Sequence, residues 1–245
     1  MKSTEKLASD SQTERVLREL RSQIIAGHWP ANSKLREVPL ASALGVSRTP
    51  LRSALLKLEQ EGLVERSGGG YTVRGFSIDD AYMAIELRGV IEGTAARLAA
   101  QRGASASDLE GIRQTVAAID RVIADELIDG YAPLNDLFHD QVAQLAGNEL
   151  LKREIERAGQ LPFAAPSAFS SSREDLSRFK TSLLIGQQHH RALVQAIERR
   201  EGARADALAR EHAQLAKANV EAAYRDHASN HRKAPQLALI TPERS

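Results

Sequence analysis

The sequence predicts a mainly α-helical protein in which a small domain with a β-hairpin precedes an all-α bundle. Three observations lead to this prediction. Apolar residues recur at helical spacing through most of the 245 residues. Two short segments that alternate like strands stand near residue 70, with three glycines between them. Behind them, Ala- and Leu-rich segments are separated by short polar breaks, a pattern typical of helices joined by tight turns.

The first domain is expected over residues 11–76, behind a disordered tail over residues 1–10. Its expected elements are, in order, a helix over 12–25, a short helix over 39–44, a helix that starts at Ser47 and ends at Gly62, and strands over 63–66 and 71–74. A helix, a helix–turn–helix and a β-hairpin in this order make a winged helix-turn-helix. The sequence therefore predicts this architecture at the N-terminal end.

The second domain is expected over residues 77–227 as a bundle of six helices. The predicted helices cover 78–102, 107–128, 131–146, 148–160, 174–200 and 203–227. Residues 161–173 are rich in Pro and Ser, which predicts a loop and makes this segment a candidate lid. Residues 228–245 contain Pro235 and Pro242 and are expected to form a flexible tail.

The composition excludes several classes of site. The chain has no Cys, which rules out disulfides, Cys-ligated zinc fingers, iron–sulfur clusters and thiol nucleophiles. A metal site in this chain must therefore use His, carboxylates or amides. Hydrophobic residues make up 42% of the chain and charged residues 27%, as in soluble globular proteins. The chain has no signal-peptide pattern and no apolar run of membrane-spanning length, so we expect a cytoplasmic protein with no membrane partner.

The formal net charge of +1 is distributed unevenly along the chain. Residues 1–76 contain 12 Lys and Arg against 8 Asp and Glu, whereas residues 77–227 contain 18 against 23. The last 18 residues add 3 basic residues and 1 Glu. A basic N-terminal segment on an acidic body indicates that a polyanion binds at the N-terminal end.

A long motif over residues 35–73 surrounds the second helix of the helix–turn–helix. It runs through Leu35-Arg36-Glu37, Leu40-Ala41, Leu44 to Pro50, Leu51-Arg52 and Glu61-Gly62-Leu63-Val64. This motif resembles, without a gap, the DNA-binding domain of the GntR family of bacterial transcription regulators. The resemblance implies a winged helix-turn-helix that binds a double-stranded DNA operator.

The start of the second helix is chemically suited to contact DNA. Free backbone N–H groups and the positive end of the helix dipole can meet phosphate oxygens there. Arg48 and Arg52 are four residues apart and share one face, from which they can reach base edges in the major groove. The resemblance assigns DNA contacts to Ser47, Arg48, Thr49 and Arg52 and brings Gly69 or Gly70 of the wing to the minor groove; Arg36, in the same motif, completes the candidate set.

Two departures from the family pattern affect the operator. Val38 stands where many members carry a DNA-contacting Arg, and Ser53 stands where Glu is usual. The operator is therefore not expected to be that of the better-known members. Outside this motif, two exposed arginines would more often be a solvated face than a DNA contact.

Three of the seven His residues are placed so that they can converge inside the bundle. Asn135 and His139 are four residues apart and share one helix face. His190 lies 11 residues before Glu201 and His212 lies 10 residues after Gly202, so an antiparallel hairpin closing there puts both at one height. Bundles build metal sites in this way from facing helices, although a lone buried His is more often a core residue.

The region 78–227 is similar to the FCD-type effector domain of the FadR subfamily of GntR regulators. Its metal-binding members carry an Asp or Asn before a Phe-His pair, a second His at the start of an apolar helical stretch, and a third His twenty-two residues later. The resemblance implies four ligands for a divalent ion: Asn135, His139, His190 and His212. Zinc or nickel suits such ligands. His189 is expected to point elsewhere, since adjacent helix positions differ by about 100°.

Arg88 matches a family Arg on the first bundle helix that often faces the effector cavity. The resemblance implies that Arg88 can form a bidentate pair with the carboxylate of an effector. The alternative is a surface ion pair with Glu92, four residues later on the same helix.

We therefore expect a homodimeric, ligand-responsive transcription regulator, most simply a repressor, that senses a small carboxylate in a metal-containing bundle. One alternative is a regulator for which the metal itself is the signal. A third hypothesis, a His-ligated metalloenzyme, is disfavoured because H-E-x-x-H is absent and no motif places a general base.

Overall fold

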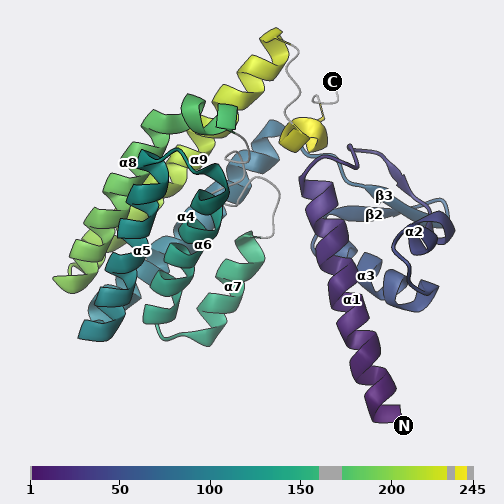
Figure 1. Cartoon of the computed structure of the whole chain (residues 1–245), viewed down its shortest axis with the longest axis horizontal. Helices are drawn as coiled ribbons and strands as arrows, with labels where there is room; N and C mark the ends of the chain where they lie inside the picture. The colour runs from purple at the N-terminus through teal and green to yellow at the C-terminus, as the bar shows by residue number, and fades with distance from the viewer. Residues whose placement is uncertain (1, 160–172, 231–234, 242–245) are drawn as a thin grey trace. The chain divides into compact units, whose positions relative to one another are not determined.

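The computed structural model describes residues 2–159, 173–230 and 235–241 (Figure 1). The chain forms two compact units. The first, called the head below, contains Met1–Asp80 together with Arg232–Ser245, and the second, called the bundle, contains Ala81–His231. The head therefore takes in both ends of the chain.

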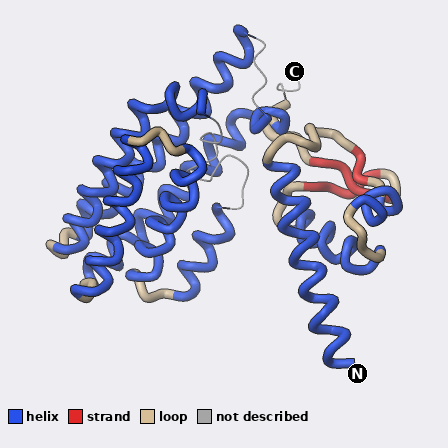
Figure 2. Tube along the Cα trace, viewed as in Figure 1, coloured by secondary structure: helices blue, strands red, loops and turns tan. Residues whose placement is uncertain are grey.

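The head is a winged helix-turn-helix. It begins with α1 (Lys2–Ile25), and the other elements follow in order as β1 (Lys34–Leu35), α2 (Glu37–Ala43), α3 (Arg48–Gln60), β2 (Val64–Ser67) and β3 (Gly70–Val73). The strands, red in Figure 2, form an antiparallel sheet in the order β1-β3-β2. Gly68 and Gly69 join β2 to β3, and their φ angles of 54° and 84° are the positive values that a type I′ hairpin turn requires. The β2–β3 hairpin is the predicted wing.

The core of the head lies between α1 and α3. Apolar residues of the two helices recur every three or four positions and are buried: Leu17, Leu20, Ile24, Leu51, Leu55 and Leu58. Arg21 Nη2 also pairs with Glu61 Oε1 at 2.5 Å, which ties α1 to the end of α3. Because one face of α3 is used for the core, its opposite face remains open to solvent.

Two features of the head differ from the sequence-based expectation. The strand β1 was not expected; it pairs Lys34 with Thr72 and Leu35 with Tyr71. Two residues are too few to show the alternation that identifies a strand. The helix α1 begins at Lys2, within the segment expected to be a disordered tail. That segment is polar, but Lys, Glu, Leu and Ala have high helix propensity, so the helix extends through it.

The bundle contains the six expected helices, each within four residues of its predicted ends (Figure 1). They are α4 (Ile78–Arg102), α5 (Ala106–Ala124), α6 (Ile128–Leu145), α7 (Glu149–Gly159), α8 (Arg173–Glu198) and α9 (Gly202–Asn230). The helix α5 packs against α6 and α8, and α8 packs against α9 along the hairpin that turns at residues 199–201. The apolar core between them includes Ile119, Phe138, Leu193, Ile197 and Ala209.

Two glycines of α4 lie close against α9. A Cβ placed on Gly89 of α4 would lie 3.0 Å from Cβ of Ala213 on α9. A Cβ on Gly93 would clash with Oδ1 of Asp206 and lie 3.1 Å from the Asp206 carbonyl oxygen. These glycines let the two backbones approach, which brings the polar side chains of α4 next to those of α9.

Residues 228–230 and 235–241, the described part of the predicted flexible tail over residues 228–245, are structured, so the prediction was wrong for them. The helix α9 continues to Asn230, and Pro235–Leu239 form a 3-10 helix, η1, that belongs to the head. Leu237 and Leu239 are buried, and Ile240 forms a parallel bridge with Phe76. The two prolines suggested an unstructured end, but the apolar run between them has enough hydrophobic surface to be held on the head.

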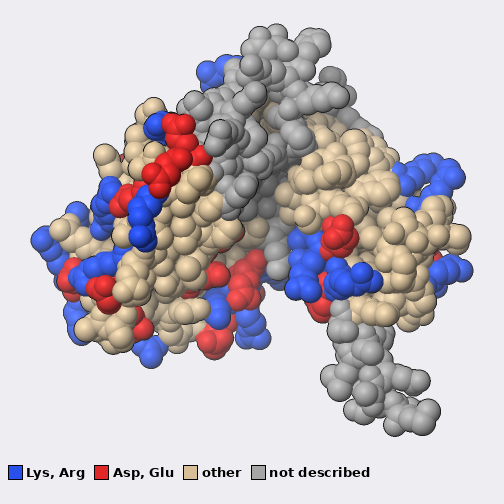
Figure 3. All heavy atoms as spheres, viewed as in Figure 1, with Lys and Arg blue, Asp and Glu red and all other residues tan. Residues whose placement is uncertain are grey.

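The candidate lid over residues 161–173 falls almost wholly outside the described residues; only Arg173, the first residue of α8, is described. Among the helices that the structure describes, none has the length and apolar character needed to cross a membrane. On the face of the bundle seen in Figure 3, basic and acidic side chains are interspersed.

Candidate functional site

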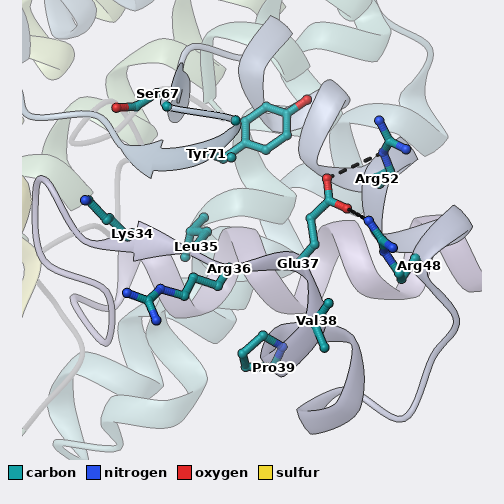
Figure 4. Close-up of a pocket in the computed structure, with 13 residues that line it drawn as sticks. Lys34, Leu35, Arg36, Glu37, Val38, Pro39, Arg48, Arg52, Ser67 and Tyr71 are labelled. Atoms are coloured by element: carbon teal, nitrogen blue, oxygen red, sulfur yellow. Dashed lines mark hydrogen bonds and ion pairs between the residues drawn. The ribbon is translucent and has the colours of Figure 1, made fainter.

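A hollow of about 770 Å³ on the head gathers most of the predicted DNA-binding residues (Figure 4). Its lining comes from β1 and the start of α2, from α3 and from the wing, and includes Lys34, Arg36, Glu37, Arg48, Arg52, Gly69 and Gly70. Ser47 and Thr49 are exposed at the start of α3 but do not line the hollow. Segments that are distant in the sequence thus form one basic surface around the recognition helix α3.

The recognition helix starts at the predicted position. Ser47 occupies the N-cap with extended backbone angles, but its side chain makes no capping hydrogen bond. The hydroxyl of Ser47 and the N–H groups of the first turn therefore remain available to an external acceptor such as a phosphate. Pro50 is buried in the first turn, where its missing N–H costs no helical hydrogen bond.

Glu37 holds the two arginines of the recognition helix, a role that the sequence analysis missed. Arg48 Nη2 donates to Glu37 Oε2 at 3.0 Å, and Arg52 Nε lies 3.5 Å from Glu37 Oε1 (Figure 4). The arginine side chains are 63% and 68% exposed, whereas the Glu37 side chain is 16% exposed. A largely covered carboxylate thus orients two exposed guanidinium groups on the surface expected to meet DNA.

The second candidate site is a histidine centre inside the bundle. His139 of α6, His190 of α8 and His212 of α9 bring one ligand atom each to within 4.8 Å of one another. His190 Nε2 lies 3.3 Å from His212 Nε2. Two nitrogens bound to one tetrahedral zinc at about 2.0–2.1 Å would be separated by a similar distance. The spacing from the α8–α9 turn thus brings the two side chains together as predicted.

Gln187 fixes which nitrogen of His190 is free. The Gln187 Nε2 group donates to Val116 O at 2.7 Å and to Asp120 Oδ1 at 2.8 Å. These two acceptors leave the Gln187 amide oxygen facing His190 Nδ1 at 2.9 Å. His190 Nδ1 must therefore carry the proton and donate, so the lone pair of Nε2 points toward His212.

A carboxylate lies beside His139 at ion-pair distance. Glu92 Oε2 lies 3.4 Å from His139 Nδ1, and Glu92 Oε1 lies 3.3 Å from Arg88 Nε. Burial raises the pKa of Glu92, but the Arg88 guanidinium and His139 outweigh it and bring that pKa to about 2. Glu92 is therefore ionised, and it turns Nε2 of His139 toward the other two imidazoles. This Nε2 is buried with no hydrogen-bond partner among the described residues.

Burial also affects the protonation of the other two histidines. It lowers the pKa of His190 well below its usual range, with a further contribution from His139. It lowers the pKa of His212 in the same direction, with contributions from His190 and His139. Both imidazoles are therefore neutral near pH 7, which is the form that binds a metal ion.

Asn135 is the predicted fourth ligand and is fully buried. Its Oδ1 accepts a hydrogen bond from the Tyr131 hydroxyl at 3.3 Å, and its Nδ2 has no partner among the described residues. Asn135 shares the lining of a cavity of about 20 Å³ with Tyr131, Arg88 and His212. Exchanging the two amide atoms would aim the oxygen the other way. The unpartnered nitrogens here and on His139 are consistent with a site built for an ion.

Arg88 combines the two interpretations given to it. It pairs with Glu92, as the simpler alternative proposed, but the pair is buried rather than on the surface. It also lines the small cavity beside His212, and its contact with an effector stays a prediction. His189 is not one of the three converging imidazoles: its Nε2 lies 4.0 Å from Glu211 Oε1, and its ring lies edge-on to that of His212.

Sequence reasoning missed the residues that orient the site, although faint signals existed. Glu92 stands four residues after Arg88, Tyr131 stands four before Asn135, and Gln187 stands three before His190. The spacings place Tyr131 and Gln187 on the faces of Asn135 and His190, whereas that of Glu92 relates it only to Arg88 and not to His139 on another helix. Such spacings are common on any helix, so they carried no information until the partners were seen.

Two families of known proteins match the chain. The family described as bacterial regulatory proteins, gntR family, matches residues 12–73, and the FCD domain matches residues 84–215. The first range lies within the head and the second within the bundle.

Individual relatives agree with the family matches. The chain is 30% identical over 177 residues to a probable D-xylose utilization operon transcriptional repressor of Paenarthrobacter nicotinovorans. The aligned part makes up 72% of this chain and 74% of the relative. It is 32% identical over 135 residues to the Nta operon transcriptional regulator of Aminobacter aminovorans, and the aligned part makes up 54% of this chain and 62% of that regulator. The structure of E. coli McbR/YncC has the same fold, with a TM-score of 0.67 and 18% sequence identity. The superposition covers 87% of this chain and 98% of McbR/YncC. The chain therefore belongs to the gntR family of bacterial regulatory proteins, with an FCD domain behind its DNA-binding head, and is a transcription regulator rather than an enzyme.

Proposed function

We propose that this regulator is a repressor that senses a small organic acid at a divalent metal ion held in the bundle. The observation that carries the proposal is the histidine centre, in which three buried or half-buried imidazoles converge from three helices. His139, His190 and His212 would hold the ion, with Asn135 as a fourth ligand. Zinc or nickel would supply a Lewis-acidic position at which a carboxylate oxygen can bind. The relative from Paenarthrobacter nicotinovorans is named a repressor, which supports repression here.

Arg88 is the residue best placed to recognise the acid. Its guanidinium lines the same cavity as His212 and Asn135, so one carboxylate can meet both a cation and the metal-binding residues. The cavity of about 20 Å³ has room for about one water molecule, so an organic acid must widen it. Widening moves α9 relative to the helices around it. The acid would therefore favour a different arrangement of the bundle, which is the energetic basis of a switch.

The small cavity also favours a second candidate, in which the metal ion alone is the signal. A second cavity, lined by Glu92, His139 and His212, measures only about 10 Å³. A metal ion would occupy the space between the three ligand nitrogens, which already lie within 4.8 Å of one another. Binding would draw three helices onto one ion without any organic ligand.

One experiment separates the two candidates. A DNA duplex selected by the purified protein from a random pool serves as the operator probe, and its affinity is measured at one fixed salt concentration. The protein is tested without metal, with Zn²⁺, and with Zn²⁺ plus a panel of small mono- and dicarboxylates. The acid-sensing proposal predicts that an acid lowers the affinity of the Zn²⁺ form. A change caused by Zn²⁺ alone supports the metal-sensing candidate, and constant affinity throughout contradicts both.

A homodimer is part of the proposal. Met83, Leu87 and Val90 of α4 are 67%, 48% and 36% exposed and are spaced so that they form one apolar stripe. A second copy related by a two-fold axis would cover this stripe with the same residues. Charged substitutions at Met83 and Leu87 together should convert the dimer to a monomer in sedimentation equilibrium.

Glu37→Gln is expected to loosen the selectivity of DNA binding. The change removes the carboxylate that engages Arg48 and Arg52 but keeps the size of the side chain. Two exposed ion pairs are worth about 1 kcal/mol together, so affinity for an unrelated duplex should rise about fivefold as the arginines become free. The measured ratio of operator to unrelated-duplex affinity should fall. If only operator affinity falls and unrelated binding is unchanged, Glu37 acts by positioning alone.

Glu92→Gln is expected to weaken metal binding without removing a ligand. Loss of a carboxylate that orients a metal-binding His typically costs 10–100-fold in metal affinity. Competition with a coloured chelator measures this affinity on the folded variant. Glu86→Gln, on the exposed side of the same helix, is the matched control and should leave the affinity unchanged. Equal affinity in both variants would rule out an orienting role for Glu92.

A further inference from the structure

The C-terminal segment 235–241 makes backbone contacts with two parts of the head that are distant in sequence. The Ala31 N–H donates to Ala238 O at 2.9 Å. The Phe76 N–H donates to Leu239 O, and the Thr241 N–H donates to Phe76 O, both at 2.9 Å. Hydrogen bonds on both sides of Phe76 are the pattern of a parallel strand pair. The segment is thus held on the head by one parallel bridge between Phe76 and Ile240, which directly follows the 3-10 helix η1.

Side chains strengthen this attachment. Leu237 and Leu239 are 4% and 1% exposed, so the apolar part of the segment is covered. A Cβ on Gly75 would lie 2.6 Å from Cγ2 of Thr241, which means that the segment fits closely where residue 75 has no side chain. Peptides that bind by strand addition use this combination: main-chain hydrogen bonds for affinity and apolar side chains for specificity.

We propose that residues 235–241 are a strap, docked on a dedicated site of the head, that connects the last helix of the bundle to the DNA-binding surface. The site consists of the loop around Ala31, residues 75–76 and the end of α1. Its occupant is the chain's own C-terminal segment. The signalling role of the strap rests on the function proposed above, whereas its docking does not.

The strap is connected at one end to the sensing site. The helix α9 carries His212, and its residues Ala216 and Asn219 line the cavity beside it. Only residues 231–234 separate the end of α9 at Asn230 from the start of η1 at Pro235. In the proposal, this covalent connection is what joins α9 to the docked segment.

At its other end the strap touches the frame of the DNA-binding hollow. Next to Ala31, Asn32 donates to Val73 O and Val73 donates to Ser33 O, each at 2.9 Å. These bonds hold the start of β1 against β3. Lys34, the first residue of β1, lines the hollow. Hydrogen bonds thus link the strap to the loop before β1 and this loop to β3, next to a residue that lines the hollow.

The docking is tested with the double variant Leu237→Ser/Leu239→Ser in the full chain. Hydrogen exchange at the Ala31 and Phe76 amides should become faster, because both amides donate to the strap. In the proposal, only the form with the docked strap binds the operator well. A variant in which the strap is docked about a tenth of the time should therefore bind the operator about tenfold more weakly. The exposed double variant Ser42→Ala/Ser53→Ala serves as the control for exchange at these amides. Unchanged exchange at Ala31 and Phe76 overturns the proposal.

A chain that ends at Asn230 provides the second test, by rescue. A synthetic peptide with the sequence of residues 233–245 is added at up to millimolar concentration, the range of a short covalent tether. Trp29, the single tryptophan, lies two residues before Ala31 and reports docking by its fluorescence. The peptide should give a saturable change and restore operator affinity, whereas a peptide with both leucines replaced by Ser should do neither. Equal behaviour of the two peptides overturns the docking.

The mixture of the truncated chain and the peptide also tests whether the strap must be covalently joined to α9. In wild-type protein, the operator affinities with and without Zn²⁺ differ if the bundle senses metal. In the truncated chain with the peptide, operator affinity should return while the effect of Zn²⁺ does not, because the peptide is not joined to α9. Return of the Zn²⁺ effect overturns the role of the strap but not its docking. If wild-type protein shows no Zn²⁺ effect, metal sensing fails, and the peptide titration still decides the docking.

Discussion

Replacing Arg48 and Arg52 together with Ala is expected to reduce operator binding to the level of unrelated DNA. Both guanidinium groups are exposed on one face of α3 and line the hollow with the wing. A bidentate arginine contact with a guanine discriminates by about 1–3 kcal/mol, so losing two costs about 2–6 kcal/mol of specific binding. The substitutions also leave Glu37 without its partners, and its charge then repels the DNA phosphates.

The measurement is the operator affinity and the unrelated-duplex affinity at one salt concentration, taken on the same protein sample. Arg18→Ala is the matched control, because Arg18 is exposed on α1 of the same head and does not line the hollow. It should change both affinities slightly and leave their ratio intact. A double variant that still prefers the operator would show that α3 is not the recognition helix.

Replacing His190 and His212 together with Ala is expected to remove bound metal from the protein. These two imidazoles bring their Nε2 atoms to 3.3 Å from each other in the centre. With both gone, His139 and Asn135 remain, and two ligands do not hold zinc in a structural site. Elemental analysis of the purified wild type should give about one ion per chain, and the double variant should give close to none.

Thermal unfolding provides an independent reading of the same prediction. A ligand present at 1,000 times its Kd stabilises the native state by about 4.1 kcal/mol, so Zn²⁺ should raise the Tm of the wild type. The double variant should show no such rise. His189→Ala is the matched control: it removes the neighbouring imidazole, which lies beside Glu211 and outside the cluster. Equal metal content in wild type, double variant and control would reject the site.

The sequence could predict the features that depend on spacing along one helix or across one turn. The fold, the six bundle helices and the meeting of His190 with His212 all follow from periodicity and from the position of the α8–α9 turn. The approach of His139 to this pair needed the resemblance, because no local pattern says which face of α6 meets α8.

What the sequence could not predict depends on contacts between distant segments. Glu37 is an ordinary acidic residue until α2 and α3 bring it beside Arg48. Gln187 is likewise ordinary until α5 supplies the two acceptors that orient its amide. The docked C-terminal segment was missed because two prolines outweighed a short apolar run. In each case the deciding partner lies more than ten residues away or on another element.

The histidine centre contains no sulfur, and the consequence concerns oxidation. Thiolate metal sites lose their ion when oxidants convert Cys to sulfenic acid or disulfide. A chain with no Cys, whose converging ligands are imidazoles and an amide, offers no such target. Thiol oxidation is therefore not a route by which the proposed site would lose its ion, and metal content should be the same in reducing and in mildly oxidising medium.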